Sequence, residues 1–149
     1  MMKTLFAALS ATLIAILAPG AWAEVADIGV EEAYARANAG EIILVDVRTP
    51  NEWKSTGLPA HAKPIQLQRG DFVSAILATR SDAPEKPIAL ICRSGGRSAI
   101  GAKTLDEFGF KDVINVKGGM SGRAPDKGWL ESGLPTSPYN VDELAALPH

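Results

Sequence analysis

Short apolar runs alternate with helix-like segments along most of this chain, and this alternation restricts the possible folds more than any other feature. Three runs have the length and composition of strands buried on both faces: "EIILVDV" (41–47), "IALIC" (88–92) and "KDVINV" (111–116). "KPIQLQ" (63–68) is a further short strand candidate. Helix-like segments separate the runs. The pattern predicts an α/β fold with three layers, in which a mostly parallel central sheet is covered by helices on both faces.

The helix-like segments carry recognisable boundaries. Thr49, Pro50 and Glu52 form the pattern of a capping box with proline at the first helical position, which predicts a short helix after the first apolar run. The pattern of residues 30–40 predicts a helix that ends at a glycine, and residues 70–80 predict another. Residues 98–110 predict a last helix, whose inward residues recur at i+3 spacing: Ala99, Ala102, Leu105 and Phe108.

The first 23 residues have the layout of a secretory signal peptide. Lys3 gives a positive start, residues 5–18 are apolar, and Ala21-Trp22-Ala23 is a small-x-small cleavage site. An uncleaved membrane anchor is the alternative, but the apolar stretch is shorter than the roughly 20 residues that a spanning helix needs. We therefore expect cleavage after Ala23, a periplasmic or secreted protein, and no membrane attachment after cleavage. The expected organisation is a signal peptide at 1–23 and one domain at 24–149, with its core at about 28–135 and a tail at 136–149.

Charge and histidine content exclude two classes of function. The formal net charge is −2, and the basic residues are scattered and form no stripe, so we expect no nucleic-acid partner. The two histidines, His61 and His149, have no ligand-like neighbours in the sequence, so we expect no metal and no organic cofactor.

The only cysteine of the chain has unusual neighbours. Cys92 ends the run "IALIC" and is followed by "RSGGRS". Arg93 and Arg97 would bring positive charge. Gly95 and Gly96 would let backbone N–H groups turn inward as an anion-binding nest, and a helix that begins near Ser98 would add its positive dipole end. These effects favour a nucleophilic thiolate over an inert buried cysteine.

Other polar residues are expected at the same edge of the sheet. Ligand sites of open parallel sheets lie outside the carboxyl ends of the strands. Cys92 follows one strand, Asp46 and Arg48 end another, and Gly118-Gly119 follow a third. The fold therefore predicts that these three pieces of sequence meet.

The motifs "LVDVRTPNEW", "CRSGGRS" and "VINVKGGMSG", in this order, resemble the single-domain rhodanese family of thiosulfate sulfurtransferase-like proteins. The resemblance covers roughly residues 28–135. It implies a rhodanese fold and a persulfide carried on Cys92. It also implies that a loop cradles the sulfur, and that Asp46 and Arg48 support the site without reacting. The loop residues are Arg93, Ser94, Gly95, Gly96, Arg97 and Ser98. His61 stands where the family commonly has glycine, and a surface loop position is the expectation for it.

The resemblance implies a sulfurtransferase that moves a sulfane sulfur from thiosulfate or a persulfide donor to cyanide, a thiol or a protein acceptor. With one cysteine, no internal disulfide can discharge the persulfide, so the acceptor must come from outside.

Three alternatives stay open: a sulfur carrier dedicated to one partner protein, a non-catalytic binding or sensor module, and a phosphatase or arsenate reductase of the same fold. The last of these uses one more residue between cysteine and arginine than the four between Cys92 and Arg97.

Overall fold

Three fully buried parallel strands form the centre of the sheet. They are β2 (Ile43–Asp46), β5 (Ile88–Ile91) and β6 (Val113–Val116), and they confirm the three strands predicted from apolar runs. β5 lies between the other two, with Ile88 in register with Ile43 on one side and Val113 on the other. Because both faces are covered, every residue of these strands is buried. The computed structural model describes residues 25–141, and the expected signal peptide lies outside them.

Short strands complete the sheet at its edges. β1 (Ala26–Ile28) pairs with β6 and β4 (Lys63–Pro64) pairs with β2, giving the all-parallel order β1-β6-β5-β2-β4. A separate antiparallel pair joins β3 (Leu58–Pro59) to β7 (Thr136–Ser137), which lies in the segment expected to be a tail. β1, β3 and β7 have two or three residues each, too few to show a period in the sequence.

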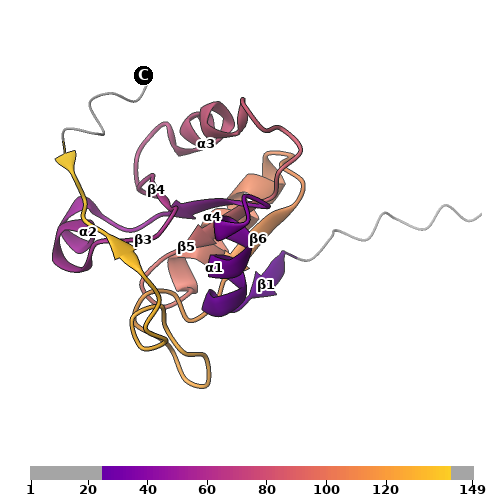
Figure 1. Ribbon diagram of the computed structural model, residues 1–149. Helices are drawn as coiled ribbons and strands as arrows, with labels where there is room; N and C mark the ends of the chain where they lie inside the picture. The colour runs from indigo at the N-terminus through magenta and orange to yellow at the C-terminus, as the bar shows by residue number, and fades with distance from the viewer. Residues whose placement is uncertain (1–24, 142–149) are drawn as a thin grey trace, which may run out of the picture.

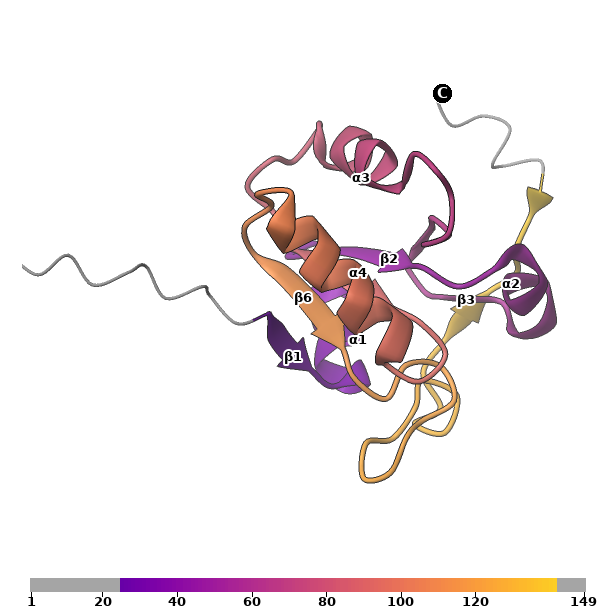
Figure 2. The same ribbon diagram turned by 180° about the vertical axis from the view of Figure 1, so that it is seen from behind.

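Within residues 25–141, four helices surround the sheet. They are α1 (Val30–Asn38), α2 (Pro50–Thr56), α3 (Phe72–Arg80) and α4 (Gly96–Glu107). α1 lies on one face, toward the viewer in Figure 1, and α4 lies on the opposite face, toward the viewer in Figure 2. α3 packs on the same side as α4, since Phe72 and Ile76 belong to the same apolar cluster as Leu105. The predicted three-layer α/β fold is confirmed.

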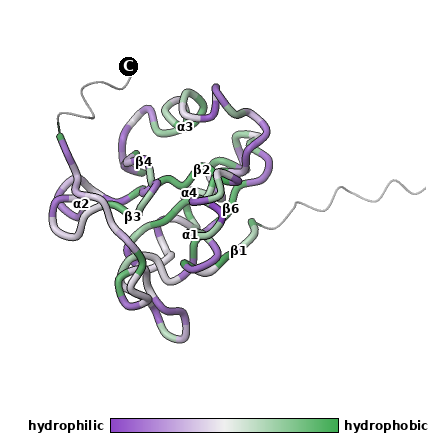
Figure 3. The backbone as a smooth tube through the Cα atoms, viewed as in Figure 1, coloured by the Kyte–Doolittle hydropathy of each residue, from purple (hydrophilic) through white to green (hydrophobic). Residues whose placement is uncertain are grey.

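The alternation of side chains along the strands builds two apolar cores. Leu44 and Ile91 point to the α1 side, whereas Val45 and Leu90 point to the side of α3 and α4. Figure 3 shows the apolar residues concentrated along the central strands, while the α3–β5 connection and the tip of the 117–135 segment are hydrophilic. Among residues 25–141, no helix is both long enough and apolar enough to cross a bilayer.

The buried face of α4 differs from the expected one. The helix begins at Gly96, two residues before the predicted start, and it buries Ser98, Gly101, Ala102 and Leu105. Phe108, expected to point inward, is 67% exposed. Residues spaced strictly by three drift about 60° per step around an α-helix, so four of them span roughly half its circumference and cannot all face one sheet.

Candidate active site

The carboxyl ends of β2, β5 and β6 meet at one edge of the sheet, as the sequence predicts. Cys92 follows β5 directly, Asp46 is the last residue of β2, and Gly118 and Gly119 come just after β6. Since β5 is the middle strand of the three, Cys92 lies between the other two strand ends. In Figure 2, β6 runs into the orange 117–135 segment at this edge.

Hydrogen-bond donors converge on the Cys92 sulfur. The N–H of Gly95 lies 3.2 Å from Sγ and the Ser98 hydroxyl lies 3.4 Å from it. Burial of the thiol raises its pKa, but hydrogen bonds from Ser98 and from the N–H groups of Ser94 and Gly95 outweigh this effect. The pKa of Cys92 therefore lies below its ordinary value. Only 1% of the residue is exposed, so a donor molecule reaches Sγ only when neighbouring atoms shift.

One glycine gives the loop its shape. Gly95 has φ +92°, a left-handed conformation that turns the chain into α4 and directs its N–H toward Sγ. Gly96 was expected to share this role, but it has no positive φ and is already the first residue of α4. The helix therefore begins four residues after Cys92, and its positive end lies close to the sulfur.

A polar chain connects Ser98 to the far edge of the sheet. The Ser98 hydroxyl lies 2.7 Å from Oδ1 of Asn115 in β6, and Nδ2 of Asn115 donates to Asp27 in β1 at 2.8 Å. Because the amide nitrogen faces a carboxylate, the amide oxygen must face Ser98 as an acceptor. The hydroxyl has one proton, and Asn115 Oδ1, the Gly95 carbonyl at 3.1 Å and the Cys92 sulfur compete for it. These hydrogen bonds were not predicted, although the asparagine inside the apolar run "VINV" was a visible signal.

Arg97 is held by a carboxylate from another element. Its two terminal nitrogens lie 2.8 and 2.6 Å from the two oxygens of Glu52, which is the capping-box residue of α2. The predicted capping box with Thr49 is present as well. Hydrogen bonds from Arg97 and Thr49 lower the pKa of Glu52 to about 2. From the sequence, Glu52 was expected only as a helix cap and Arg97 as an unpaired charge beside the thiol. The structure shows an ion pair.

Backbone hydrogen bonds join the 117–135 segment to the Cys92 loop. Met120 N–H donates to the Cys92 carbonyl at 2.9 Å, and Ser121 N–H donates to the Arg93 carbonyl at 2.8 Å. Gly119, with φ +58°, packs so close that an added Cβ would lie 2.5 Å from the Cys92 carbonyl oxygen. These bonds hold the loop carbonyls on one side and leave the N–H groups to face the sulfur. The Arg93 side chain is exposed.

Asp46 and Arg48 form a buried ion pair. Their side chains are 0% and 2% exposed, and Nη2 of Arg48 lies 2.7 Å from Oδ2 of Asp46. Arg48 also donates to Thr56 Oγ1 and to the Gly57 carbonyl, both at 2.8 Å. Burial raises the pKa of Asp46, and the contacts with Arg48 act against this rise. The pair ties the end of β2 to the end of α2, which agrees with a supporting position.

Aromatic side chains from α1, the 117–135 segment and residue 61 pack against one another. Trp129 is fully buried and donates from Nε1 to the Pro135 carbonyl at 2.9 Å, as a packing residue of the 117–135 segment. Tyr34 meets the Trp129 ring edge-on, with 5.8 Å between centroids, and stacks on His61 at 6.3 Å. His61 is exposed and has φ +68°, so this position has the backbone conformation that favours glycine.

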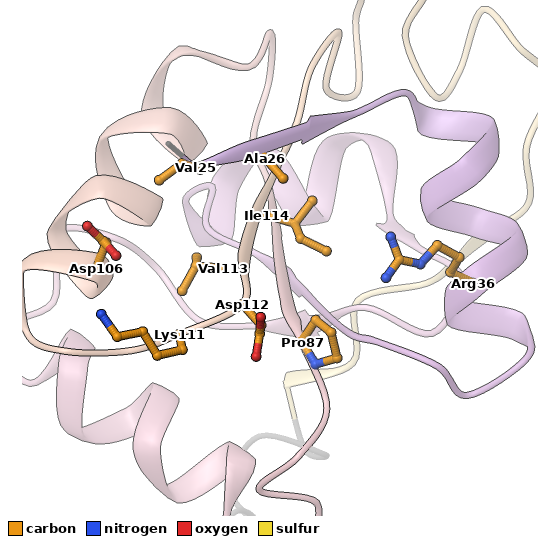
Figure 4. A pocket seen from close by; sticks show the side chains of 9 residues that line it. All are labelled: Val25, Ala26, Arg36, Pro87, Asp106, Lys111, Asp112, Val113 and Ile114. Carbon is orange, nitrogen blue, oxygen red and sulfur yellow. The ribbon is translucent and has the colours of Figure 1, made fainter. Parts of the chain in front are cut away.

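A separate hollow lies at the amino ends of the strands. It measures about 390 Å³ and contains none of the predicted site residues. Figure 4 shows Asp106 and Lys111 on one side of it and Arg36 from α1 on the other. The hollow lies at the amino ends of the strands and the Cys92 loop at their carboxyl ends.

The chain is similar to known proteins, some of which are named as sulfur transferases. An uncharacterized protein of Rickettsia prowazekii is 35% identical in an alignment of 99 residues, which covers 62% of this chain and 80% of that protein. A putative sulfurtransferase of Bacillus subtilis is 39% identical over 80 residues, covering 54% of this chain and 71% of that protein. The polysulfide-sulfur transferase homodimer of Wolinella succinogenes has a similar structure, with TM-score 0.60, 34% identity, and coverage of 80% of this chain and 82% of that chain.

Residues 29–124 match the family model described as the Rhodanese-like domain, and this range includes both the Asp46–Arg48 pair and the complete Cys92 loop. The chain belongs to the rhodanese family.

Proposed function

We propose that the protein is a sulfurtransferase that carries a sulfane sulfur as a persulfide on Cys92. The observation that carries the proposal is the convergence of the Ser94, Gly95 and Ser98 donors on Sγ. These groups stabilise a negative sulfur, and the terminal sulfur of a persulfide is also negative at neutral pH. Relatives named as sulfurtransferases support the same reaction type.

The proposed reaction has two displacement steps. The Cys92 thiolate attacks the outer sulfur of thiosulfate, the sulfur–sulfur bond of the donor breaks, and sulfite leaves with the bonding electrons. A persulfide or polysulfide donor reacts in the same way and releases a thiolate or a shorter polysulfide. An acceptor (cyanide in an assay, a thiol or a protein in the cell) then attacks the outer sulfur of the Cys92 persulfide and restores the thiolate. No redox partner is needed.

A sulfur carrier for one protein partner would use the same loop and the same first step. A binding or sensor module would not need a thiol of lowered pKa. A phosphatase or arsenate reductase would need a longer loop, sized for a tetrahedral oxyanion, with five residues between cysteine and arginine where this chain has four.

The test is sulfur loading followed by mass spectrometry. Purified protein is treated with thiosulfate, and separately with an organic persulfide, and is then desalted. We expect a gain of one sulfur atom that disappears after addition of cyanide or dithiothreitol. The Cys92→Ser variant is the matched control and should gain nothing.

The outcomes separate the alternatives. Loading without catalytic turnover by small acceptors favours the carrier. Cleavage of aryl phosphates without any sulfur adduct favours the phosphatase. Failure of every sulfane donor to load Cys92, while the thiol still reacts with iodoacetamide, refutes the sulfurtransferase proposal.

A further inference from the structure

We propose that Glu52 determines donor specificity, because its carboxylate neutralises Arg97 beside the sulfur and so disfavours doubly charged donors relative to singly charged ones. This inference rests on the proposed sulfurtransferase function and defines the class of donor that the site accepts. The favoured donor carries one negative charge or none, as organic persulfides and thiosulfonates do.

The charged groups at this edge are almost balanced. Arg97 is paired with Glu52, and Arg48 is paired with Asp46. Lys117, next to Gly118, lies 3.4 Å from Asp126. Of the two arginines in the Cys92 loop, Arg93 alone has no ion-pair partner in the part of the chain that the structure describes, and it is exposed. The Cys92 loop thus offers one arginine that no carboxylate compensates, whereas thiosulfate brings two negative charges.

The carboxylate of Glu52 is fixed in place. Its Oε2 accepts from the Thr49 N–H at 3.0 Å and from the Thr49 hydroxyl at 2.9 Å, while both oxygens bind Arg97. Moving Glu52 away from Arg97 would therefore also break the cap of α2. With its pKa lowered to about 2, Glu52 is charged at every pH at which the thiol reacts.

Arg97 is close enough to the sulfur for its charge to matter. Arg97 is the second residue of α4, and Ser98, which contacts Sγ, is the third. The hydrogen bonds with Glu52 raise the pKa of Arg97, and attraction to the negative charge of the Cys92 thiolate adds to this rise. The Arg97 and Glu52 side chains are 29% and 27% exposed, so incoming donors meet this ion pair and not a free guanidinium.

The experiment compares two donors that differ by one charge. Thiosulfate is a dianion, and methanethiosulfonate is the corresponding monoanion, with a methyl group in place of one oxygen. The quantity measured is the ratio of kcat/KM for thiosulfate to kcat/KM for methanethiosulfonate, with cyanide as acceptor. In Glu52→Gln, which keeps a side chain able to form a capping box, we expect this ratio to rise roughly threefold to tenfold, as for one charge at a partly exposed site.

Two further variants complete the design. Arg97→Gln leaves Glu52 without its partner and should lower the ratio. Glu32→Gln removes an exposed ion pair with Arg36 on α1, far from the thiol, and should leave the ratio unchanged. Alkylation of Cys92 gives a readout that does not depend on sulfur transfer, because iodoacetate is an anion and iodoacetamide is neutral. The alkylation ratio, which is the rate with iodoacetate divided by the rate with iodoacetamide, should rise in Glu52→Gln.

The two proposals fail in different ways. If neither donor loads wild-type Cys92, the proposed function fails, while the alkylation ratio still measures the effect of Glu52 on anions. If sulfur transfer occurs but Glu52→Gln changes neither the donor ratio nor the alkylation ratio, the specificity inference is overturned and the sulfurtransferase stands. A shift of the same size in Glu32→Gln would also overturn it, because the effect would then be general electrostatics.

Discussion

Gly119→Ala tests whether the 117–135 segment holds the Cys92 loop in its reactive shape. Gly119 has φ +58°, and an added Cβ would lie 2.5 Å from the Cys92 carbonyl oxygen and 2.6 Å from the Arg93 carbonyl carbon. Both atoms belong to the backbone, so no side-chain rotation can relieve the contact. The alanine must push the segment away from the loop.

The expected cost has two parts. A non-glycine residue in the left-handed region costs roughly 1–2 kcal/mol. Separation of the segment also weakens the hydrogen bonds from Met120 to Cys92 and from Ser121 to Arg93, each worth about 1 kcal/mol. The free energy of unfolding should therefore fall by roughly 3–4 kcal/mol.

Gly109→Ala is the matched control. Gly109 also has a positive φ, +87°, but an added Cβ there would meet nothing within 4 Å. This variant should show the backbone penalty alone, about 1–2 kcal/mol. The difference between the two variants isolates the packing against the loop.

The assay is urea unfolding followed by tryptophan fluorescence, since Trp53 and Trp129 are both buried. The rate of Cys92 alkylation by iodoacetamide against pH gives a second readout. Gly119→Ala should raise the pKa of Cys92, because the loop N–H groups lose their alignment, and Gly109→Ala should not. Equal destabilisation by both variants, with an unchanged thiol pKa in each, would refute the supporting role of the segment.

Three further predictions concern the polar groups of the site. Asp46→Asn leaves Arg48 buried without a countercharge, so the free energy of unfolding in urea titrations should fall by about 3–5 kcal/mol while some sulfur transfer is retained. Full stability with complete loss of turnover would show that Asp46 takes part in the chemistry. Ser98→Ala removes a hydrogen bond to the sulfur and should raise the pKa of Cys92, whereas Asn115→Val removes a competitor for the serine proton and should lower it. The rate of alkylation against pH measures both pKa values, and shifts of the same sign would contradict the competition. The pKa of Glu52 lies at about 2, below its ordinary 4.5, so its stabilising effect should be complete above pH 4.5 and lost as the pH falls toward 2. The difference in unfolding free energy between wild type and Glu52→Gln should shrink over that window, and a constant difference would show that the charge of Glu52 contributes nothing.

The sequence alone determined the features that depend on neighbouring residues. The three apolar runs became the central strands, and the Thr49–Glu52 pattern became a capping box. Cys92 was correctly expected at the carboxyl end of a strand beside two other strand ends. Each of these follows from side-chain spacing or from interactions within one turn of the chain, which are visible in a linear sequence.

Only the tertiary structure decided the electrostatics of the site. The partner of Arg97 is Glu52, 45 residues away, and the partner of Asn115 is Asp27, 88 residues away. Nothing local distinguishes a paired arginine from a free one, because pairing depends on which elements the fold places side by side. The sequence predicted that arginine charge, backbone N–H groups and the helix dipole would together stabilise the thiolate. In the structure the N–H groups and the Ser98 hydroxyl contact the sulfur, whereas Arg97 is paired with a carboxylate.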